Sequence, residues 1–321
     1  APFQVGGLVH HIGASVGIAL VHRDAADRET MMRQADIALY KAKENGRSQY
    51  QMFEPRMDVE ITRRSVLERA LREDIASDAF LPFYQPIVNL VSGTIQGFEM
   101  LARWHRPDGE EIGPNQFIPI AEECGLVGDL KLKLLDRACI DAAAWGPDIM
   151  LAVNVSPVQL KDPGFSDKVL AVLARTGFPA SRVTLEITEN ALIAEPANAK
   201  RLIQSLKSEG MLLALDDFGA GFTSIRQLMD LVPALVKIDG LFLQRATRDG
   251  EPCQSLPHLI GLIRELGGTV IVEGVETQAM ADLAFVSGAI WQQGYYHGYP
   301  EAVRSGSGHG EPMSRLVSGK S

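Results

Sequence analysis

The stretch VTLEITENALIAEPANAKRLIQSLKSEGMLLALDDF at residues 183–218 decides the fold, because it contains a strand, a helix and a second strand in succession. Val183–Thr188 and Leu212–Phe218 are short apolar runs, which are typical of buried strands. Residues 198–208 between them carry apolar side chains at helical spacing. Two strands joined by a helix predict a parallel pair, because a parallel connection needs a crossover of a dozen or more residues.

The same alternation continues on both sides of this stretch. Six further apolar runs predict strands at residues 83–88, 97–104, 150–156, 235–239, 269–275 and 290–295. From the third strand onward, helical patterns such as residues 165–175 and 256–266 lie between most of them. Eight strands alternating with helices predict an α/β fold of the (β/α)8 TIM-like barrel type.

The first connection departs from this pattern. Only residues 89–94 (NLVSGT) separate the first two strands, which is too short for a helical crossover. Ser92-Gly93 within it is a turn signal. The first strand is therefore expected to run antiparallel to its neighbour.

Composition limits the classes of function. The chain has 46% hydrophobic and 22% charged residues, as in ordinary globular proteins, and its net charge of −9 argues against binding to duplex nucleic acid. No apolar run approaches about 18 residues, so no membrane span is expected in this chain. Three cysteines without C-x-x-C spacing and no signal-peptide pattern favour a cytoplasmic location, although a longer parent protein with a membrane anchor remains compatible with this sequence.

Acidic and amide residues stand at the ends of the predicted strands, where barrel enzymes place their chemistry. They are Glu99, Asn154, Glu186, Asp216, Asp217 and Glu273, accompanied by Lys237 and Gln293. A salt bridge is the simpler explanation for any one buried carboxylate, but one lysine cannot neutralise five of them. Oxygen ligands of this kind suit two Mg²⁺ or Mn²⁺ ions, a device for in-line displacement at phosphorus.

Two basic residues complete this site hypothesis. Lys237 is expected to stabilise or deprotonate the attacking nucleophile if the site lowers its pKa. Arg103 is a candidate fork for a phosphate group, with an ordinary surface arginine as the equal alternative.

From about residue 83 to 300 the chain resembles the EAL domain, the phosphodiesterase module for the bacterial messenger cyclic di-GMP. The motifs follow in order as YQPIV (84–88), FEMLARW (98–104), FIPIAEE (117–123), AVNVS (152–156), LEITE (185–189), DDFGAGF (216–222), VKID (236–239), EGVET (273–277) and QGY (293–295). So many motifs in order make a specific match. The resemblance implies hydrolysis of cyclic di-GMP to linear pGpG with Mg²⁺ or Mn²⁺, by a homodimer formed through the EAL domain.

Carried over by position, the resemblance implies a role for each matching residue. The metal ligands would be Glu99, Asn154, Glu186, Asp216, Asp217 and Glu273. The catalytic group would be Lys237 with Gln293, and Glu189 would steady the loop after the fifth strand. The substrate would be bound by Gln85, Leu101, Arg103 and Asp239.

The sequence departs from the family pattern at four positions. Met100 replaces alanine in the family's name triplet, and Ala220 stands where threonine is usual. Gly240 and Tyr299 replace what are commonly arginines. These changes concern loop coupling, dimer signalling and substrate affinity rather than metal binding.

The amino-terminal part has one predicted strand at residues 14–20 and a helix from about residue 30 to 45. It resembles the carboxy-terminal third of a GGDEF domain without the defining Gly-Gly-Asp-Glu-Phe loop. The chain is therefore expected to derive from a longer GGDEF–EAL protein, and this part should not form cyclic di-GMP from GTP. The predicted division is a GGDEF remnant at 1–53, a linker at 54–64, the EAL domain at 65–303 and a flexible tail at 304–321.

Three functions remain open from sequence. The chain is an active cyclic di-GMP phosphodiesterase, a catalytically weak or inactive receptor domain for the same dinucleotide, or a structural partner domain. The complete set of acids favours the enzyme, because receptors of this fold usually lose several metal ligands.

Overall fold

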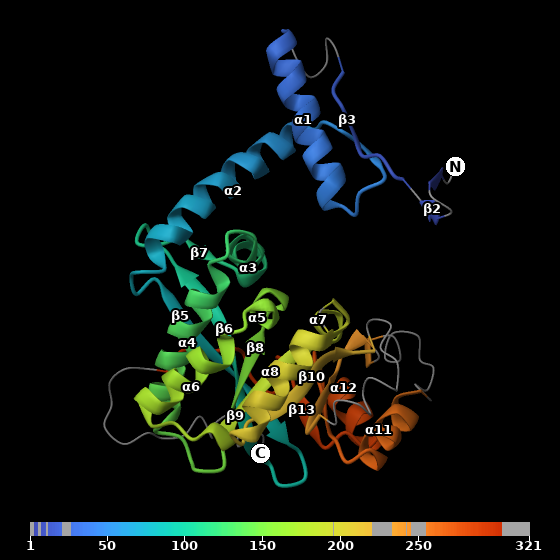
Figure 1. The fold of residues 1–321 in the computed structure, drawn as a ribbon. Coiled ribbons are helices and arrows are strands. Elements are labelled where there is room, and N and C mark those ends of the chain that lie inside the picture. Colours follow the sequence, from blue (N-terminus) through green and yellow to red (C-terminus); the bar gives the residue numbers. More distant parts are fainter. Residues whose placement is uncertain are drawn as a thin grey trace. The chain divides into compact units, whose positions relative to one another are not determined.

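The structure is a computed structural model of the 321-residue chain, and it describes residues 3–5, 8–10, 12–20, 27–194, 196–219, 233–241, 243–244 and 255–303. The chain divides into two compact units, Ala1–Glu73 and Asp74–Ser321 (Figure 1). The predicted tail at 304–321 and Ala220 lie outside the described residues.

The amino-terminal unit contains short strands and a long helix. β1 (Phe3–Val5) pairs antiparallel with β2 (Leu8–His10), and β3 (Val16–Ile18) pairs parallel with β4 (Tyr50–Met52). Helix α1 (Arg28–Glu44) begins where the Asp27 carboxylate accepts a hydrogen bond from Thr30 N at 2.9 Å. Such a cap satisfies one of the free amides at a helix start.

Helix α2 (Pro55–Asp74) includes most of residues 54–64, which the predicted division assigns to a linker. Met57 and Ile61 are one helical turn apart and pack against Ile37 and Ala38 of α1. The first turns of α2 are thus stabilised by apolar contacts with another helix. The sequence of residues 55–64 is largely charged and does not indicate these contacts.

The second unit is a closed barrel, as predicted. Its strands are β5 (Phe80–Asn89), β6 (Thr94–His105), β8 (Met150–Val155), β9 (Val183–Thr188), β10 (Leu212–Phe218), β11 (Leu235–Ile238), β12 (Thr269–Val272) and β13 (Trp291–Gln293). They are ordered β5-β13-β12-β11-β10-β9-β8-β6, and a β5–β6 pairing closes the ring. β5 is antiparallel to both neighbours and the other pairs are parallel, which confirms the predicted reversal of the first strand. The two-residue strand β7 (Glu111–Ile112) extends the sheet beyond β6 and was not predicted.

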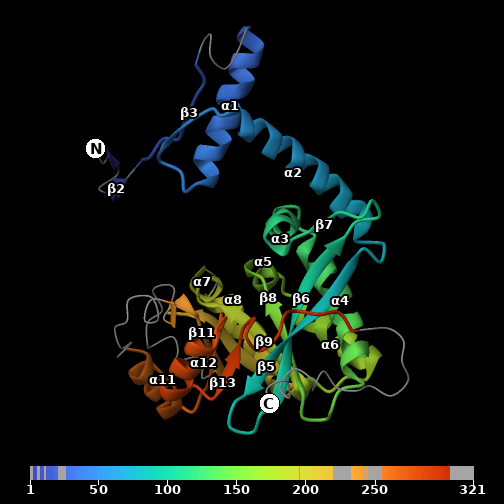
Figure 2. The same cartoon turned by 180° about the vertical axis from the view of Figure 1, so that it is seen from behind.

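Longer helices pack around the barrel, and short helices lie at the carboxyl ends of its strands (Figures 1 and 2). In chain order they are α3 (Pro114–Glu123), α4 (Val127–Ala142), α5 (Pro157–Lys161), α6 (Phe165–Thr176), α7 (Glu189–Ala194), α8 (Pro196–Ser208), α11 (Ser255–Glu265) and α12 (Gln278–Val286), with a 3₁₀ turn at Ala180–Arg182. α4 packs against β5 and β8, which matters for the site described below. None of the described helices combines the length and hydropathy needed to cross a bilayer.

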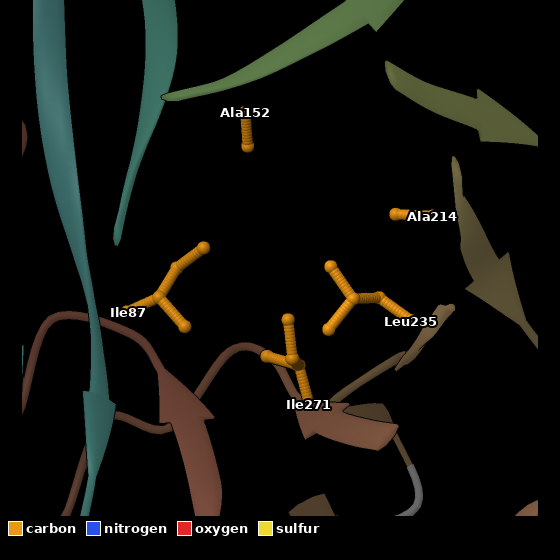
Figure 3. Close-up of a cluster of buried hydrophobic side chains, with 5 residues drawn as sticks. All are labelled: Ile87, Ala152, Ala214, Leu235 and Ile271. Atoms are coloured by element: carbon orange, nitrogen blue, oxygen red, sulfur yellow. The ribbon is translucent and has the colours of Figure 1, made fainter. Parts of the chain in front are cut away.

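An apolar layer fills the barrel interior (Figure 3). The buried side chains of Ile87, Ala152, Ala214, Leu235 and Ile271 converge there from five different strands. Side chains two residues apart on a strand share one face. The residues two positions nearer the mouth of the barrel therefore point inward as well, and these are Gln85, Asn154, Asp216, Lys237 and Glu273. The polar site lies one layer above this apolar floor.

Candidate functional site

A buried lysine occupies the centre of the polar layer. The Lys237 side chain is 1% exposed, and its ammonium lies among the carboxylates of four strands. From Nζ the distances are 2.6 Å to Glu273 Oε1, 2.9 Å to Glu186 Oε1, 3.2 Å to Glu99 Oε2 and 3.6 Å to Asp216 Oδ1. One cation thus faces four potential anions.

Glu99 joins the acids to a group of amide side chains. Asn154 Nδ2 donates to Glu99 Oε1 at 2.6 Å, and Gln293 Nε2 donates to Glu99 Oε2 at 2.6 Å. Gln293 Nε2 also lies 3.2 Å from Gln85 Oε1, and Gln85 Nε2 donates to the Gly298 carbonyl at 3.2 Å. Because the amide nitrogen of Asn154 is used by Glu99, its side-chain oxygen is left to face another donor or a cation.

Two consecutive aspartates reach the same place through a local irregularity of β10. Consecutive residues of a regular strand point to opposite faces. Asp217 has a left-handed backbone (φ 55°), and the pairing of β10 with β11 shifts register between Leu215 and Phe218. A bulge of this kind redirects a side chain. As a result, carboxylate oxygens of Asp216, Asp217 and Glu273 lie within 4.8 Å of one another.

The acids affect one another's protonation. Burial, together with repulsion from Asp216 and Glu99 and against the attraction of Lys237, raises the pKa of Glu273 to about 8. Burial likewise raises the pKa of Glu186, and repulsion from Glu99 and Asp216 adds to it. Burial alone would lower the pKa of Lys237, but the surrounding carboxylates outweigh it and raise that pKa well above its ordinary value. The condition set for deprotonation by Lys237, a lowered pKa, is therefore not met in this arrangement, because four acids face the ammonium.

The donor set fits a hard divalent cation. It consists of carboxylate and amide oxygens, without a cysteine or histidine. Burial, followed by repulsion from Asp216 and Asp239, also raises the pKa of Asp217. Oε2 of Glu186 is buried and has no hydrogen-bond partner among the described residues. Raised carboxyl pKa values and an unpartnered buried oxygen indicate a site that holds more negative charge than Lys237 balances.

The other residues expected at the site have separate local environments. Glu189 begins α7 and is buried, and neither of its carboxylate oxygens has a hydrogen-bond partner in the described part of the chain. Asp239 follows β11 and accepts a hydrogen bond from Leu241 N at 2.8 Å. Leu101 pairs with Phe83 across β5 and β6. The Arg103 guanidinium lies 5.4 Å from the centre of the Phe83 ring.

The structure thus brings together nine of the expected residues and leaves others apart. Hydrogen bonds, ion pairs or the acidic group within 4.8 Å join Gln85, Glu99, Asn154, Glu186, Asp216, Asp217, Lys237, Glu273 and Gln293. Within the described ranges, no hydrogen bond or ion pair joins Glu189, Leu101 or Arg103 to this group.

Lys131 of α4 is a site residue that the sequence analysis missed. Its ammonium donates to the main-chain carbonyl of Asn154 at 2.7 Å. Burial lowers the pKa of Lys131 to about 8, against the attraction of Glu122, Glu99 and Glu186. A pKa of about 8 still leaves it mostly protonated at pH 7. Helical spacing in the sequence could have indicated its orientation, because Lys131 lies one turn after the buried Val127 on the side of α4 that faces the barrel.

Comparison with known proteins places this geometry in a family. The EAL domain model matches residues 68–300, and the GGDEF diguanylate cyclase domain model matches residues 1–49. A signalling protein of Caulobacter vibrioides is 40% identical over 305 residues, which cover 94% of this chain and 38% of that protein. The bifunctional diguanylate cyclase/cyclic di-GMP phosphodiesterase MucR of Pseudomonas aeruginosa is 32% identical over 303 residues, covering 93% and 44%. The chain thus spans about two fifths of the length of these curated relatives.

Solved structures agree with the sequence matches. A structure of the PaMucR phosphodiesterase in complex with c-di-GMP superposes with a TM-score of 0.70 at 30% identity, covering 74% of this chain and 98% of that one. The FimX EAL domain from Pseudomonas aeruginosa, bound to c-di-GMP, gives a TM-score of 0.68 at 26% identity, covering 73% and 96%. With its eight-stranded barrel, its reversed first strand and an EAL match over residues 68–300, this chain belongs to the EAL domain family.

Proposed function

We propose that this chain is a cyclic-guanylate-specific phosphodiesterase that hydrolyses cyclic di-GMP to linear pGpG with two Mg²⁺ or Mn²⁺ ions. The observation that carries the proposal is the complete set of strand-end acids around Lys237. The similarity to MucR, described as a cyclic di-GMP phosphodiesterase, and to a FimX EAL domain bound to c-di-GMP supports cyclic di-GMP as the substrate.

The metal ligands in this proposal are Glu99, Asn154, Glu186, Asp216, Asp217 and Glu273. When bound, divalent ions supply positive charge to the phosphate oxygens and activate water. The chain's own contribution is to hold the oxygen donors in place. Asn154 and Gln293 fix both oxygens of Glu99 by hydrogen bonds of 2.6 Å, so that this carboxylate is oriented before any ion arrives.

Lys237 acts as a fixed positive charge beside the reacting phosphodiester. Because its pKa is raised, it carries a proton at neutral pH in the absence of metal. A protonated lysine can stabilise developing negative charge or donate a proton to the leaving oxygen, and we assign it this role in place of a general base.

Substrate contacts are assigned to Gln85, Leu101, Arg103 and Asp239. Arg103 stacks on Phe83, which holds the guanidinium as a planar donor for a phosphate or a guanine edge. Glu189 would steady the loop after β10. Its two buried carboxylate oxygens have no hydrogen-bond partner among the described residues, and main-chain amides of a loop are suitable donors for them.

Binding without hydrolysis is the competing function. Lys237 already fills the centre of the acid cluster, which gives the site a partly neutralised state without metal. A receptor domain can bind the dinucleotide with its acid cluster in this partly neutralised state. A hydrolase, by contrast, requires divalent ions to bind to the same acid cluster.

Product analysis separates these functions. The purified chain is incubated with cyclic di-GMP and Mn²⁺ or Mg²⁺, and the nucleotides are separated by chromatography. We expect pGpG with either ion and intact substrate with a chelator. Dinucleotide that binds tightly but remains intact with Mn²⁺ would favour the receptor, and failure to bind it would refute both functions.

The proposal includes a homodimer formed through the EAL domain. Light scattering on the purified chain should report twice the 34.9 kDa mass of the monomer. A mass of one chain at concentrations used for hydrolysis would refute the dimer and leave the phosphodiesterase untouched.

A further inference from the structure

Lys131 approaches the acid cluster from outside the barrel. It lies on α4, which packs against β8, and its ammonium binds the carbonyl oxygen of Asn154 at 2.7 Å. Its side chain is partly buried. No carboxylate lies within ion-pair distance of it in the described ranges.

A short series of contacts leads from Lys131 to the centre of the cluster. Asn154 donates through Nδ2 to Glu99 Oε1 at 2.6 Å. Glu99 in turn contacts Lys237 through Oε2 at 3.2 Å. The charges of Glu99 and Glu186 both act on the Lys131 ammonium. Lys131 is therefore a second cation within the field of the acids, held on the main chain of one of their partners.

A purely structural role is the simpler explanation, and the same helix offers a comparison. Lys133, two residues further along α4, binds the main-chain carbonyls of Ile75 and Ser77. That contact also ties α4 to a neighbouring segment, but it involves none of the strand-end acids. If Lys131 only anchored the helix, replacing either lysine would have the same kind of effect.

We propose that Lys131 is a built-in counter-charge of the metal site, which holds the end of β8 through Asn154 and limits how tightly a divalent cation binds to the acid cluster. The inference rests on the proposed function, because it requires that the cluster binds divalent ions. Two positive charges repel over several ångströms, and they do so more strongly beside buried groups such as Glu99 and Glu186 than in bulk water. Removing the lysine charge should therefore strengthen cation binding, even though one anchor of Asn154 is lost.

The test is a Mn²⁺ titration without substrate, followed by calorimetry or by the electron paramagnetic resonance signal of free Mn²⁺. Lys131→Met removes both charge and contact, whereas Lys131→Gln keeps a hydrogen-bond donor without the charge. We expect the dissociation constant for Mn²⁺ to fall about tenfold in both variants, since the lost repulsion is Coulombic. Lys131→Arg, which keeps the charge, and the matched control Lys133→Met should stay within about threefold of the wild-type value.

Each outcome decides the proposal. Unchanged or weaker Mn²⁺ binding in the folded Lys131→Gln variant would overturn it, and so would an equal gain in Lys133→Met. Thermal unfolding in the presence of a chelator identifies any variant that fails to fold. If Lys131→Met does not fold, the Mn²⁺ affinity of Lys131→Gln alone tests the proposal. Wild-type protein that binds Mn²⁺ but leaves cyclic di-GMP intact would refute hydrolysis alone, and wild-type protein that binds no Mn²⁺ would refute the metal site and this proposal together.

Discussion

Glu99 is the residue on which the proposed metal site depends most, because both of its oxygens are occupied by other site residues. Asn154, Gln293 and Lys237 all contact it. Glu99→Gln keeps the shape but removes the charge, so Mn²⁺ affinity should fall at least tenfold and hydrolysis by about 10²-fold or more. Metal titration and single-turnover hydrolysis measure the two effects. Hydrolysis at the wild-type rate would show that the metal site has been assigned wrongly.

Lys237→Met should have the opposite effect on metal binding. The variant leaves four carboxylates without their cation, which costs up to about 3 kcal/mol of folding free energy without metal. Mn²⁺ should then raise the melting temperature more than in the wild type, while hydrolysis falls by about 10²–10⁴-fold. Lys133→Met is the matched control for removal of a lysine. Loss of Mn²⁺ binding in Lys237→Met would mean that the lysine holds the acids in place rather than serving the reaction.

His297 provides a prediction about pH that lies outside the acid cluster. Burial lowers the pKa of His297 to about 4, and its ring Nε2 lies 2.9 Å from Gln292 Oε1. As the pH falls from about 6.5 to 4, His297 takes up a proton in the unfolded chain but not in the folded chain. The contribution of His297 to the free energy of unfolding is therefore present above pH 6.5 and is lost on acidification. Partial exposure limits the effect to about 2 kcal/mol at most.

Denaturant unfolding at several pH values tests this prediction. The free energy of unfolding should fall less steeply between pH 6.5 and 4 in His297→Gln than in the wild type. Parallel curves for the wild type and His297→Gln would contradict the prediction.

At the scale of the elements, the ends of β11 and β12 approach closely at a glycine. A Cβ atom on Gly240 would lie 2.6 Å from the Glu273 carbonyl oxygen and 3.1 Å from Gly274 Cα. The family's more common arginine therefore does not fit here without moving the residue that carries a site carboxylate. Glycine at position 240, where the family commonly has arginine, therefore fits the close packing of these two strand ends.

Gly240→Ala should consequently displace Glu273 and weaken Mn²⁺ binding severalfold, with a matching loss of hydrolysis. The control is Gly261→Ala in α11, where a Cβ atom meets no other atom within 4 Å. That change should leave metal binding unchanged and stabilise the helix slightly. Equal metal affinity in the wild type and Gly240→Ala would show that the strand ends can separate without disturbing the acids.

The elements also show what the sequence can and cannot predict. All eight barrel strands were identified because each is a short apolar run bounded by polar residues. The acids could be assigned to one site because the carboxyl ends of parallel strands meet at one edge of the barrel. The topology alone determines this arrangement. Lys131 was missed because helical spacing places it only on the barrel-facing side of α4, whereas its contact with Asn154 depends on how α4 packs on β8. β12 was expected to reach residue 275 but ends at Val272, since Gly274 takes a positive φ of 60°.

At the scale of the whole molecule, the two compact units have separate apolar interiors. Ile37, Ala38, Phe53 and Met57 form a cluster within the first unit, and Ile87, Ala152, Ala214, Leu235 and Ile271 form the barrel floor in the second. Every residue assigned to metal, substrate or catalysis belongs to the second unit. The GGDEF domain model matches residues 1–49, and the chain contains no Gly-Gly-Asp-Glu-Phe sequence.

Deletion of residues 1–54 should therefore leave hydrolysis of cyclic di-GMP within about threefold of the full chain, since the barrel keeps its floor and its acids. The cut retains α2 and with it Asp74, whose Oδ2 accepts a hydrogen bond from Trp104 Nε1 at 2.8 Å at the edge of the barrel. Steady-state hydrolysis by the two proteins measures the effect, and incubation of the full chain with GTP is the companion assay. A loss of more than tenfold would mean that the barrel needs the first unit for its active geometry, and formation of cyclic di-GMP from GTP would mean that the first unit has a catalytic site of its own.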